Sequence, residues 1–191
     1  MKYFKNLTVL MLVIASSAAR TVSAQEKVFY SFPSGATPTA DLVQDAAGNL
    51  YGMTTTGGTG NGSVFELSPS SGGSWTEKDI YVFGTSGPLD GAKPSPPSGL
   101  FLDGKGNLYG TTEFGGKGRV GTIFELSPAS GGTWTETVLW NFPTIPGVGT
   151  FGNPRYGVIL DANGNIYGLT SDQDGRANNT VFELSPSAGG S

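Results

Sequence analysis

The sequence has 191 residues, among them 31 Gly and 12 Pro, and it has no Cys and no His. Because Gly and Pro cost about 1 and about 3 kcal/mol in a helix interior, this composition favours an all-β fold with many turns. The lack of Cys excludes a disulfide framework, and the lack of His excludes Ser-His or Cys-His catalytic pairs and most zinc sites.

The N-terminal region predicts a signal peptide over residues 1–24. Lys2 and Lys5 precede the apolar stretch LTVLMLVIASSAA, and Val22-Ser23-Ala24 supplies small residues before a cleavage site. The uninterrupted apolar run is about ten residues long, whereas a membrane span needs about twenty. We therefore expect cleavage after Ala24 by a bacterial Sec-type pathway, export to the cell surface or medium, and no membrane span afterwards.

The expected mature chain is acidic. Of the eleven basic residues, Lys2, Lys5 and Arg20 lie in the leader, so eight remain against fifteen acidic ones, a net charge of −7. Binding to nucleic acid needs basic residues that displace counterions from the phosphates. A nucleic-acid partner is therefore not expected.

Three copies of one unit fill the rest of the sequence. GNLYG at 48–52, GNLYG at 106–110 and GNIYG at 164–168 recur every 58 residues, and VFELSP at 64, IFELSP at 123 and VFELSP at 181 follow at spacings of 59 and 58 residues. A repeat of this kind predicts one supersecondary element per copy. We divide residues 25–191 into a first segment 25–32, unit 1 (33–83), unit 2 (84–142) and unit 3 (143–191).

Each unit predicts a run of short strands in the same order. A short apolar run (42–44, 100–102 or 158–160) leads into a DxxGN turn, in which Asp bonds the backbone ahead and Gly takes a positive φ. The second strand begins at NLYG or NIYG, and the third is SVFELS or its equivalents, with alternating apolar and polar residues. The fourth strand, WTEKDIYVF or WTETVLWNF, follows an SPxxGG turn.

The third copy reads PSAGGS at 186–191, where the earlier copies continue into Trp75 and Trp134. The segment QEKVFYSF at 25–32 matches TEKDIYVF at 76–83 in its charged, apolar and aromatic positions. We therefore predict that residues 25–32 form the fourth strand of unit 3, beside Val181 to Leu184. Such a permuted strand closes a toroid of sheets and leaves no exposed edge.

The motifs GNLYGTT, GTIFELSP and GGTWTETVL resemble the GloVer (Gloeo_Verruco) tandem repeat family, and the resemblance covers nearly all of residues 26–190. It implies exported bacterial proteins with several copies of a β-propeller-like repeat, and it implies no activity. The predicted fold is an all-β, β-propeller-like array of three four-stranded blades. This sequence departs from the family in having few copies.

Three blades are fewer than the four to eight of typical propellers. Three arrangements remain open: a fragment of a longer repeat protein, a homodimer that closes a six-bladed ring, or three blades packed around a filled centre.

The polar residues that recur in every unit, and the Trp residues that recur in units 1 and 2, are interpreted as structural. Glu66, Glu125 and Glu183 are expected to face solvent or cap a neighbour, and Asp45, Asp103 and Asp161 to hold turns. Trp75 and Trp134 are expected to pack between blades, with stacking on sugar rings as the alternative.

The loops between the second and third strands and the links between units differ most among the copies, and loops carry function on rigid scaffolds. We expect both to emerge on one face, the variable loop face. Its candidate binding residues are Asp90, Lys93, Glu113, Phe114, Arg119, Phe151, Arg155, Tyr156, Asp172, Asp174 and Arg176. Asp172 and Asp174 precede Gly175 as in part of a calcium loop, but the match is weak because it lacks the third acidic ligand and the closing Glu. No metal or cofactor is therefore expected, and Ca²⁺ at Asp172 and Asp174 is a weak candidate.

The function expected from these features is that of an exported repeat scaffold that binds a protein or glycan at or outside the cell surface without catalysis. The first alternative is a carbohydrate-active propeller hydrolase or lyase that uses Asp/Glu or Tyr/Arg, an analogy from fold alone. The second is a truncated fragment of a longer repeat protein.

Overall fold

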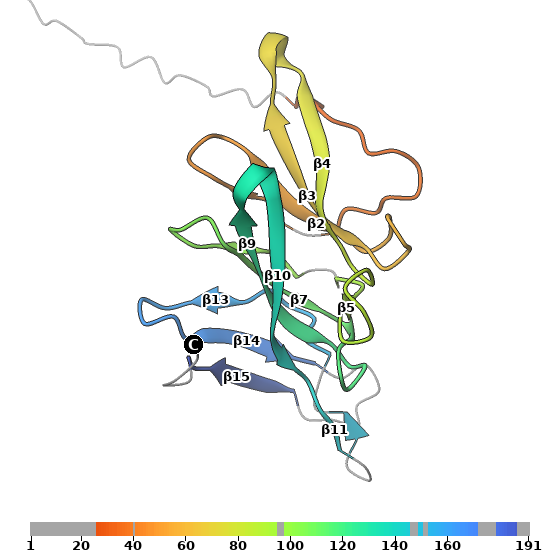
Figure 1. Cartoon of the computed structure of the whole chain (residues 1–191), viewed down its shortest axis with the longest axis vertical. Coiled ribbons are helices and arrows are strands. Elements are labelled where there is room, and N and C mark those ends of the chain that lie inside the picture. Colours follow the sequence, from red (N-terminus) through yellow and green to blue (C-terminus); the bar gives the residue numbers. More distant parts are fainter. Residues whose placement is uncertain are drawn as a thin grey trace, which may run out of the picture.

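The computed structural model describes residues 26–39, 41–94, 98–145, 149–150, 153–171 and 179–186. Throughout these ranges the fold is all-β: the described residues form antiparallel sheets and two 3-10 turns, and no α-helix. The sheets of units 1, 2 and 3 follow one another along the longest axis of the molecule (Figure 1). No helix in the described ranges has the length and apolar character that crossing a bilayer requires.

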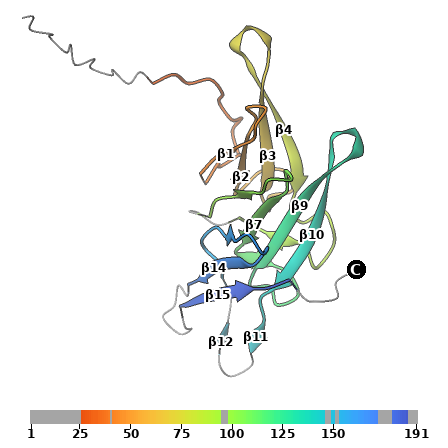
Figure 2. The same ribbon diagram turned by 90° about the vertical axis from the view of Figure 1, so that its left-hand side faces the viewer.

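Units 1 and 2 each form a four-stranded antiparallel meander, as the repeat predicts. In unit 1 the order is β1 (Val43–Gln44), β2 (Leu50–Thr54), β3 (Ser63–Pro69) and β4 (Trp75–Val82). In unit 2 it is β6 (Phe101–Leu102), β7 (Leu108–Thr112), β9 (Thr122–Ala129) and β10 (Thr133–Asn141). The 3-10 turns η1 (Ser71–Gly73) and η2 (Ser130–Gly132) join the last two strands of each sheet, and both hairpins project from the stack (Figure 2).

Unit 3 has three described strands, β13 (Ile159–Leu160), β14 (Ile166–Thr170) and β15 (Thr180–Leu184). Two short ribbons involve the links between units, the first of them joining a link to the loop between β7 and β9. β5 (Gly91–Ala92) pairs with β8 (Phe114–Gly115), and β11 (Thr144–Ile145) pairs with β12 (Gly149–Thr150).

The DxxGN turn has the predicted structure in all three units. In unit 2, Asp103 Oδ1 accepts hydrogen bonds from the backbone N of Lys105 and of Asn107, both at 2.8 Å, and Gly106 has a φ of +90°. Asp103 Oδ2 also accepts from the Tyr109 hydroxyl at 3.4 Å. Asp45 and Asp161 make the same contacts, so the repeated Asp residues hold turns, as predicted.

A second repeated Gly lets an aromatic ring lie across the sheet. Gly110 on β7 pairs with Phe124 on β9, and a Cβ at Gly110 would lie 2.6 Å from Phe124 Cζ. A Cβ added at Gly52 would lie 2.5 Å from Phe65 Cζ, and one added at Gly168 would clash with the Phe182 ring in the same way. The second Gly of GNLYG therefore leaves space for the Phe of FELSP.

The core lies between successive units rather than inside each one. Between units 1 and 2, Phe83 stacks edge-on against Phe124 with ring centroids 5.2 Å apart, and between units 2 and 3, Phe142 meets Phe182 at 5.5 Å. The buried residues of the first junction are Tyr51, Met53, Val64, Ile80, Phe83, Leu100, Leu108, Phe124 and Leu126. Trp134 packs against this cluster with its ring 5.9 Å from that of Tyr51, so the prediction that it packs between units is confirmed.

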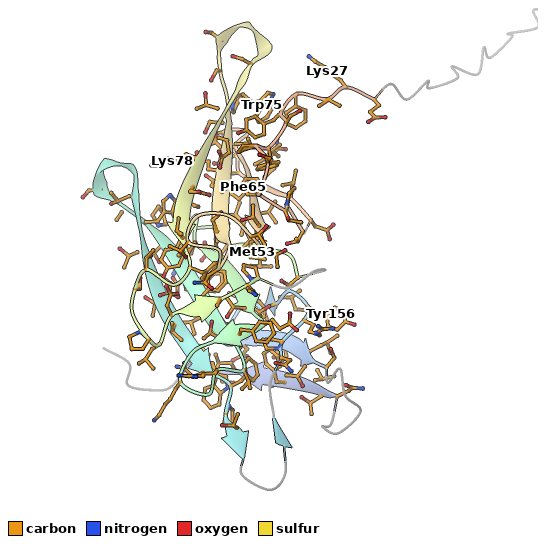
Figure 3. The ribbon with its side chains drawn as sticks, turned by 90° about the vertical axis from the view of Figure 1, so that its right-hand side faces the viewer. Lys27, Met53, Phe65, Trp75, Lys78 and Tyr156 are labelled. Atoms are coloured by element: carbon orange, nitrogen blue, oxygen red, sulfur yellow. The ribbon has the colours of Figure 1, made fainter. Side chains whose placement is uncertain are left out.

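The prediction that residues 25–32 form the fourth strand of unit 3 is wrong. Residues 26–32, here called the head segment, form no strand and lie on unit 1. Phe29 stacks on Trp75 at 4.6 Å, the Tyr30 hydroxyl donates to Glu77 Oε2 at 3.3 Å, and Phe32 meets Phe65 at 4.8 Å. Figure 3 shows Lys27 and Trp75 at the same end of the molecule, far from β15 at the other end in Figure 1.

The reason is that the head segment contacts unit 1 as a fourth strand contacts the unit that follows it. Phe32 on Phe65 repeats Phe83 on Phe124, and Tyr30 on Glu77 repeats the interaction of Tyr81 with Glu136. Unit 1 follows the segment directly in the chain and offers this surface locally. The described sheets form an open stack, and none of them closes into a ring.

Candidate functional site

The variable loops and the unit-linking segments meet at the junctions between units. In the first link, β5 pairs with β8 from the loop of unit 2, so that Gly91 lies opposite Gly115 and Ala92 opposite Phe114. The backbone N of Glu113 donates to the carbonyl oxygen of Lys93 at 3.1 Å. Four candidates therefore lie together on or beside this ribbon: Asp90, Lys93, Glu113 and Phe114.

Asp90 organises the first link from a buried position. Its Oδ2 accepts hydrogen bonds from the backbone N of Gly84 at 2.7 Å and of Ser86 at 3.1 Å. Its other oxygen, Oδ1, is buried and has no hydrogen-bond partner among the described residues. Half of this carboxylate is thus used to fix the loop 84–90.

A second carboxylate lies close to Asp90 across the junction of units 1 and 2. Glu136 projects from β10, and burial, followed by the charge of Asp90, raises the pKa of Glu136 to about 7, although an interaction with Tyr81 lowers it. The Tyr81 hydroxyl donates to Ser86 Oγ at 2.9 Å, and burial raises its pKa. Tyr81, Asp90 and Glu136 therefore form one acidic cluster inside the junction.

Glu136→Gln is expected to stabilise the protein at pH 8 and to leave it unchanged at pH 4. The folded state holds the Glu136 proton more tightly than the unfolded chain, so stability falls as pH rises from about 4.5 to about 7. The expected gain at pH 8 is about 1 kcal/mol, because partial exposure of the side chain screens its charge. Urea unfolding at both pH values measures the change in the free energy of unfolding. The control is Glu183→Gln, which replaces an exposed Glu. An equal gain at pH 4 would rule out titration of Glu136 as the cause.

An ion pair joins units 2 and 3. Arg155 Nη2 lies 2.7 Å from Glu113 Oε1, and Arg155 Nε donates to the same oxygen at 3.3 Å. The carbonyl oxygen of the next residue, Tyr156, accepts a hydrogen bond from Thr111 Oγ1 at 3.1 Å. Glu113 and Arg155 thus hold the start of unit 3 against the end of β7.

Two aromatic side chains beside this ion pair remain exposed. Phe114 follows Glu113 and is 44% exposed, and Tyr156 follows Arg155 and is 42% exposed (Figure 3 labels Tyr156). Lys93 and Arg119 both adopt a positive φ, of 51° and 58°. The other four candidates, Phe151, Asp172, Asp174 and Arg176, lie outside the described residues, and so does the weak Ca²⁺ candidate formed by Asp172 and Asp174.

The repeated Glu residues have structural partners. Glu66, Glu125 and Glu183 each accept a hydrogen bond from the Ser two residues on, at 2.8, 2.9 and 2.8 Å. Of the two roles expected from the sequence, facing solvent or capping a neighbour, all three carboxylates cap a neighbouring hydroxyl, and only Glu183 is also exposed. Tyr109 donates its hydroxyl to Asp103 in the DxxGN turn of unit 2. Burial, followed by the charges of Glu125 and Asp103, raises the pKa of Tyr109 to about 12, so this hydroxyl stays a donor at neutral pH.

A groove of about 710 Å³ lies between units 2 and 3, away from the variable loops. Its walls are mainly apolar or aromatic: Tyr109, Glu125, Leu139, Trp140, Leu160, Gly164, Ile166, Leu184, Ser185 and Pro186. At the preceding junction, the residues at the positions of Tyr109 and Leu139 are Tyr51 and Ile80, which lie in the cluster that Trp134 covers. The groove therefore marks the place at which a fourth strand would enter unit 3.

The model of the Gloeobacter/Verrucomicrobia repeat matches residues 14–191. The chain belongs to the Gloeobacter/Verrucomicrobia repeat family. No curated protein matches it at a significant level. The family assignment agrees with the resemblance seen in GNLYG and FELSP. In this member of the Gloeobacter/Verrucomicrobia repeat family, GNLYG completes a turn and its second Gly leaves space for a Phe ring. FELSP supplies that Phe, which packs at the junction between units.

Sequence reasoning missed two features of this Gloeobacter/Verrucomicrobia repeat. Glu136 was not among the candidates, because its neighbours Tyr81 and Asp90 are about fifty residues away in the chain. The second feature is a hydroxyl pair at the base of each variable loop, Thr54–Ser63, Thr112–Thr122 and Thr170–Thr180, at 2.9, 2.9 and 2.7 Å. The recurrence of Ser or Thr at these positions in every unit was the signal that could have revealed the pairs.

Proposed function

We propose that the chain is an exported repeat scaffold that binds a protein or glycan at or outside the cell surface, without catalysis. The supporting observation is that the carboxylates of the variable loop face have structural partners, whereas its aromatic side chains are exposed. The described carboxylates Asp90 and Glu113 fix a loop and a junction, whereas Phe114 and Tyr156 keep more than two fifths of their surface exposed. Exposed aromatic side chains held on a rigid scaffold supply contact area for a ligand at little entropic cost.

The hydrolase alternative would need two carboxylates about 5 to 10 Å apart with a substrate between them. Asp90 and Glu136 influence one another, and Glu136 would carry a proton near neutral pH, as a general acid does. However, Asp90 is buried with one oxygen committed to the backbone, and neither carboxylate lines the groove between units 2 and 3. A sugar would have to open the junction to reach Asp90, so the two carboxylates cannot act together on one substrate, which favours binding over hydrolysis.

The proposal is tested on residues 25–191 by affinity electrophoresis in gels that contain a soluble polysaccharide, one gel each for xylan, β-glucan and mannan. At least one gel is expected to retard the protein, and the Phe114→Ala/Tyr156→Ala variant is expected to lose about tenfold in affinity, about 1.4 kcal/mol. Leu89→Ala, which removes an aliphatic side chain that is 53% exposed, serves as the control.

Release of reducing sugar that disappears in Glu136→Gln would favour the hydrolase over the scaffold. Retardation that is unaffected by the aromatic double variant would remove the variable loop face as the site. If no polysaccharide retards the protein, the proposal that the ligand is a glycan is wrong. The proposal that the ligand is a protein is then tested by comparing the same variants in a pull-down from the cell envelope.

A further inference from the structure

The outward face of unit 3, here called the tail face, is apolar and uncovered by the described residues. Ile159, Leu169 and Val181 are 64%, 43% and 77% exposed. At the same positions of unit 1, Met53 and Val64 are 1% and 0% exposed, because unit 2 packs on them. The tail face therefore has the composition of a unit junction whose second half is absent from the described structure.

The head segment, at the other end of the stack, packs like a fourth strand but belongs to no described sheet. It contacts unit 1 through Phe29, Tyr30 and Phe32, in the way that a fourth strand contacts the following unit. Yet no described strand pairs with it, and Val28 is 71% exposed. One end of the described stack thus presents a segment that packs like a fourth strand but has no described sheet, and the other end presents a sheet with three described strands.

We infer that copies of this chain associate head to tail, with the head segment of one copy adding as the fourth strand to β15 of another. The exposed apolar side chains of the tail face would then pack against unit 1 of that copy. Each such contact would repeat the junctions already present between units 1, 2 and 3.

The register of the proposed pairing follows from unit 1. There Glu66 on β3 lies opposite Lys78 on β4, and Val64 lies opposite Tyr81. By the repeat, Glu183 would lie opposite Lys27, and Val181 opposite Tyr30. Opposite charges face one another in this register, and cross-strand pairs of this kind contribute roughly 0.2–1 kcal/mol each.

The partner has to be a second copy rather than the same chain. The head segment and β15 lie at opposite ends of the longest axis in both ribbon views (Figures 1 and 2). A head-to-tail contact joins different surfaces, so it gives a closed ring if the rotation closes and an open filament if it does not. A ring of two chains would hold the six units of the homodimer considered from the sequence.

The test uses the absence of Cys from the sequence. Two single-Cys forms of residues 25–191, Lys27→Cys and Glu183→Cys, are mixed and oxidised. Directly opposed residues have Cβ atoms about 4.5–5.5 Å apart, within reach of a disulfide. We expect a linked dimer of the two variants in about tenfold higher yield than from Ser31→Cys with Glu183→Cys, which are out of register. All three positions are exposed, so the fold is preserved.

Mass photometry of the chain without Cys gives a second readout. Species larger than a monomer are expected, a single dimer mass indicating a ring and a ladder of masses indicating a filament. Val181→Asp should shift the protein to monomer while its circular dichroism spectrum stays unchanged. Equal disulfide yields from both pairs, a monomer at all concentrations, or a disulfide within a single Lys27→Cys/Glu183→Cys chain would overturn the inference.

Discussion

Replacing Phe83 with Ala is expected to lower the free energy of unfolding by about 3–5 kcal/mol. Phe83 is fully buried at the junction of units 1 and 2, where its ring packs edge-on against Phe124. The truncation removes the burial of an aromatic ring and leaves a cavity between two sheets that share this core. Urea unfolding of residues 25–191, followed by Trp fluorescence, measures the loss.

The matched control is Phe114→Ala, which removes the same ring from an exposed position. Its expected effect is within about 0.5 kcal/mol of zero, as for most surface substitutions. Because units in a stack contact only their neighbours, Phe83→Ala is also expected to separate unfolding into two transitions. Equal effects of the two substitutions would show that the junction does not carry the core.

Gly110→Ala is expected to cost about 1–3 kcal/mol, even though Ala is normally the better residue in place of Gly. The added Cβ would lie 2.6 Å from Phe124 Cζ and 3.1 Å from Leu100 Cδ2, both of them on buried side chains. Either ring or strand has to shift in a tightly packed junction. Thermal and urea unfolding both report the loss.

Gly104→Ala provides the comparison, because no atom lies within 4 Å of the Cβ it would gain and its φ is not positive. That substitution is expected to be neutral or to stabilise by a few tenths of a kcal/mol through the unfolded chain. A neutral Gly110→Ala would mean that the second Gly of GNLYG is not kept free for the Phe ring.

Local motifs made the strands and turns predictable from the sequence. Asp103 and Gly106 specify their turn through hydrogen bonds within four residues. The alternation in FELSP places Phe124 and Glu125 on opposite faces of the sheet, Phe124 buried and Glu125 half-buried. Each of these depends on contacts that lie close in the chain. Repetition in three units then separated structural positions from variable ones.

The position of the head segment could not be predicted in the same way. Its match to TEKDIYVF identified residues able to pack like a fourth strand, but such a strand contacts both its own sheet and the next unit. In the structure the head segment contacts the next unit, with Phe32 on Phe65, whereas the prediction placed it in the sheet of unit 3. Glu136 was missed for a related reason, since its raised pKa depends on Tyr81 and Asp90 from another unit and a link.

The repeated junction also bears on how such genes can change. Phe32 on Phe65, Phe83 on Phe124 and Phe142 on Phe182 are one contact made three times, so any unit offers its neighbour a compatible surface. Unequal recombination that gains or loses a 58-residue copy would therefore create no mismatched boundary. Copy number can drift between generations while the surface loops diversify separately, and a concatemer built in the laboratory should tolerate the same insertion.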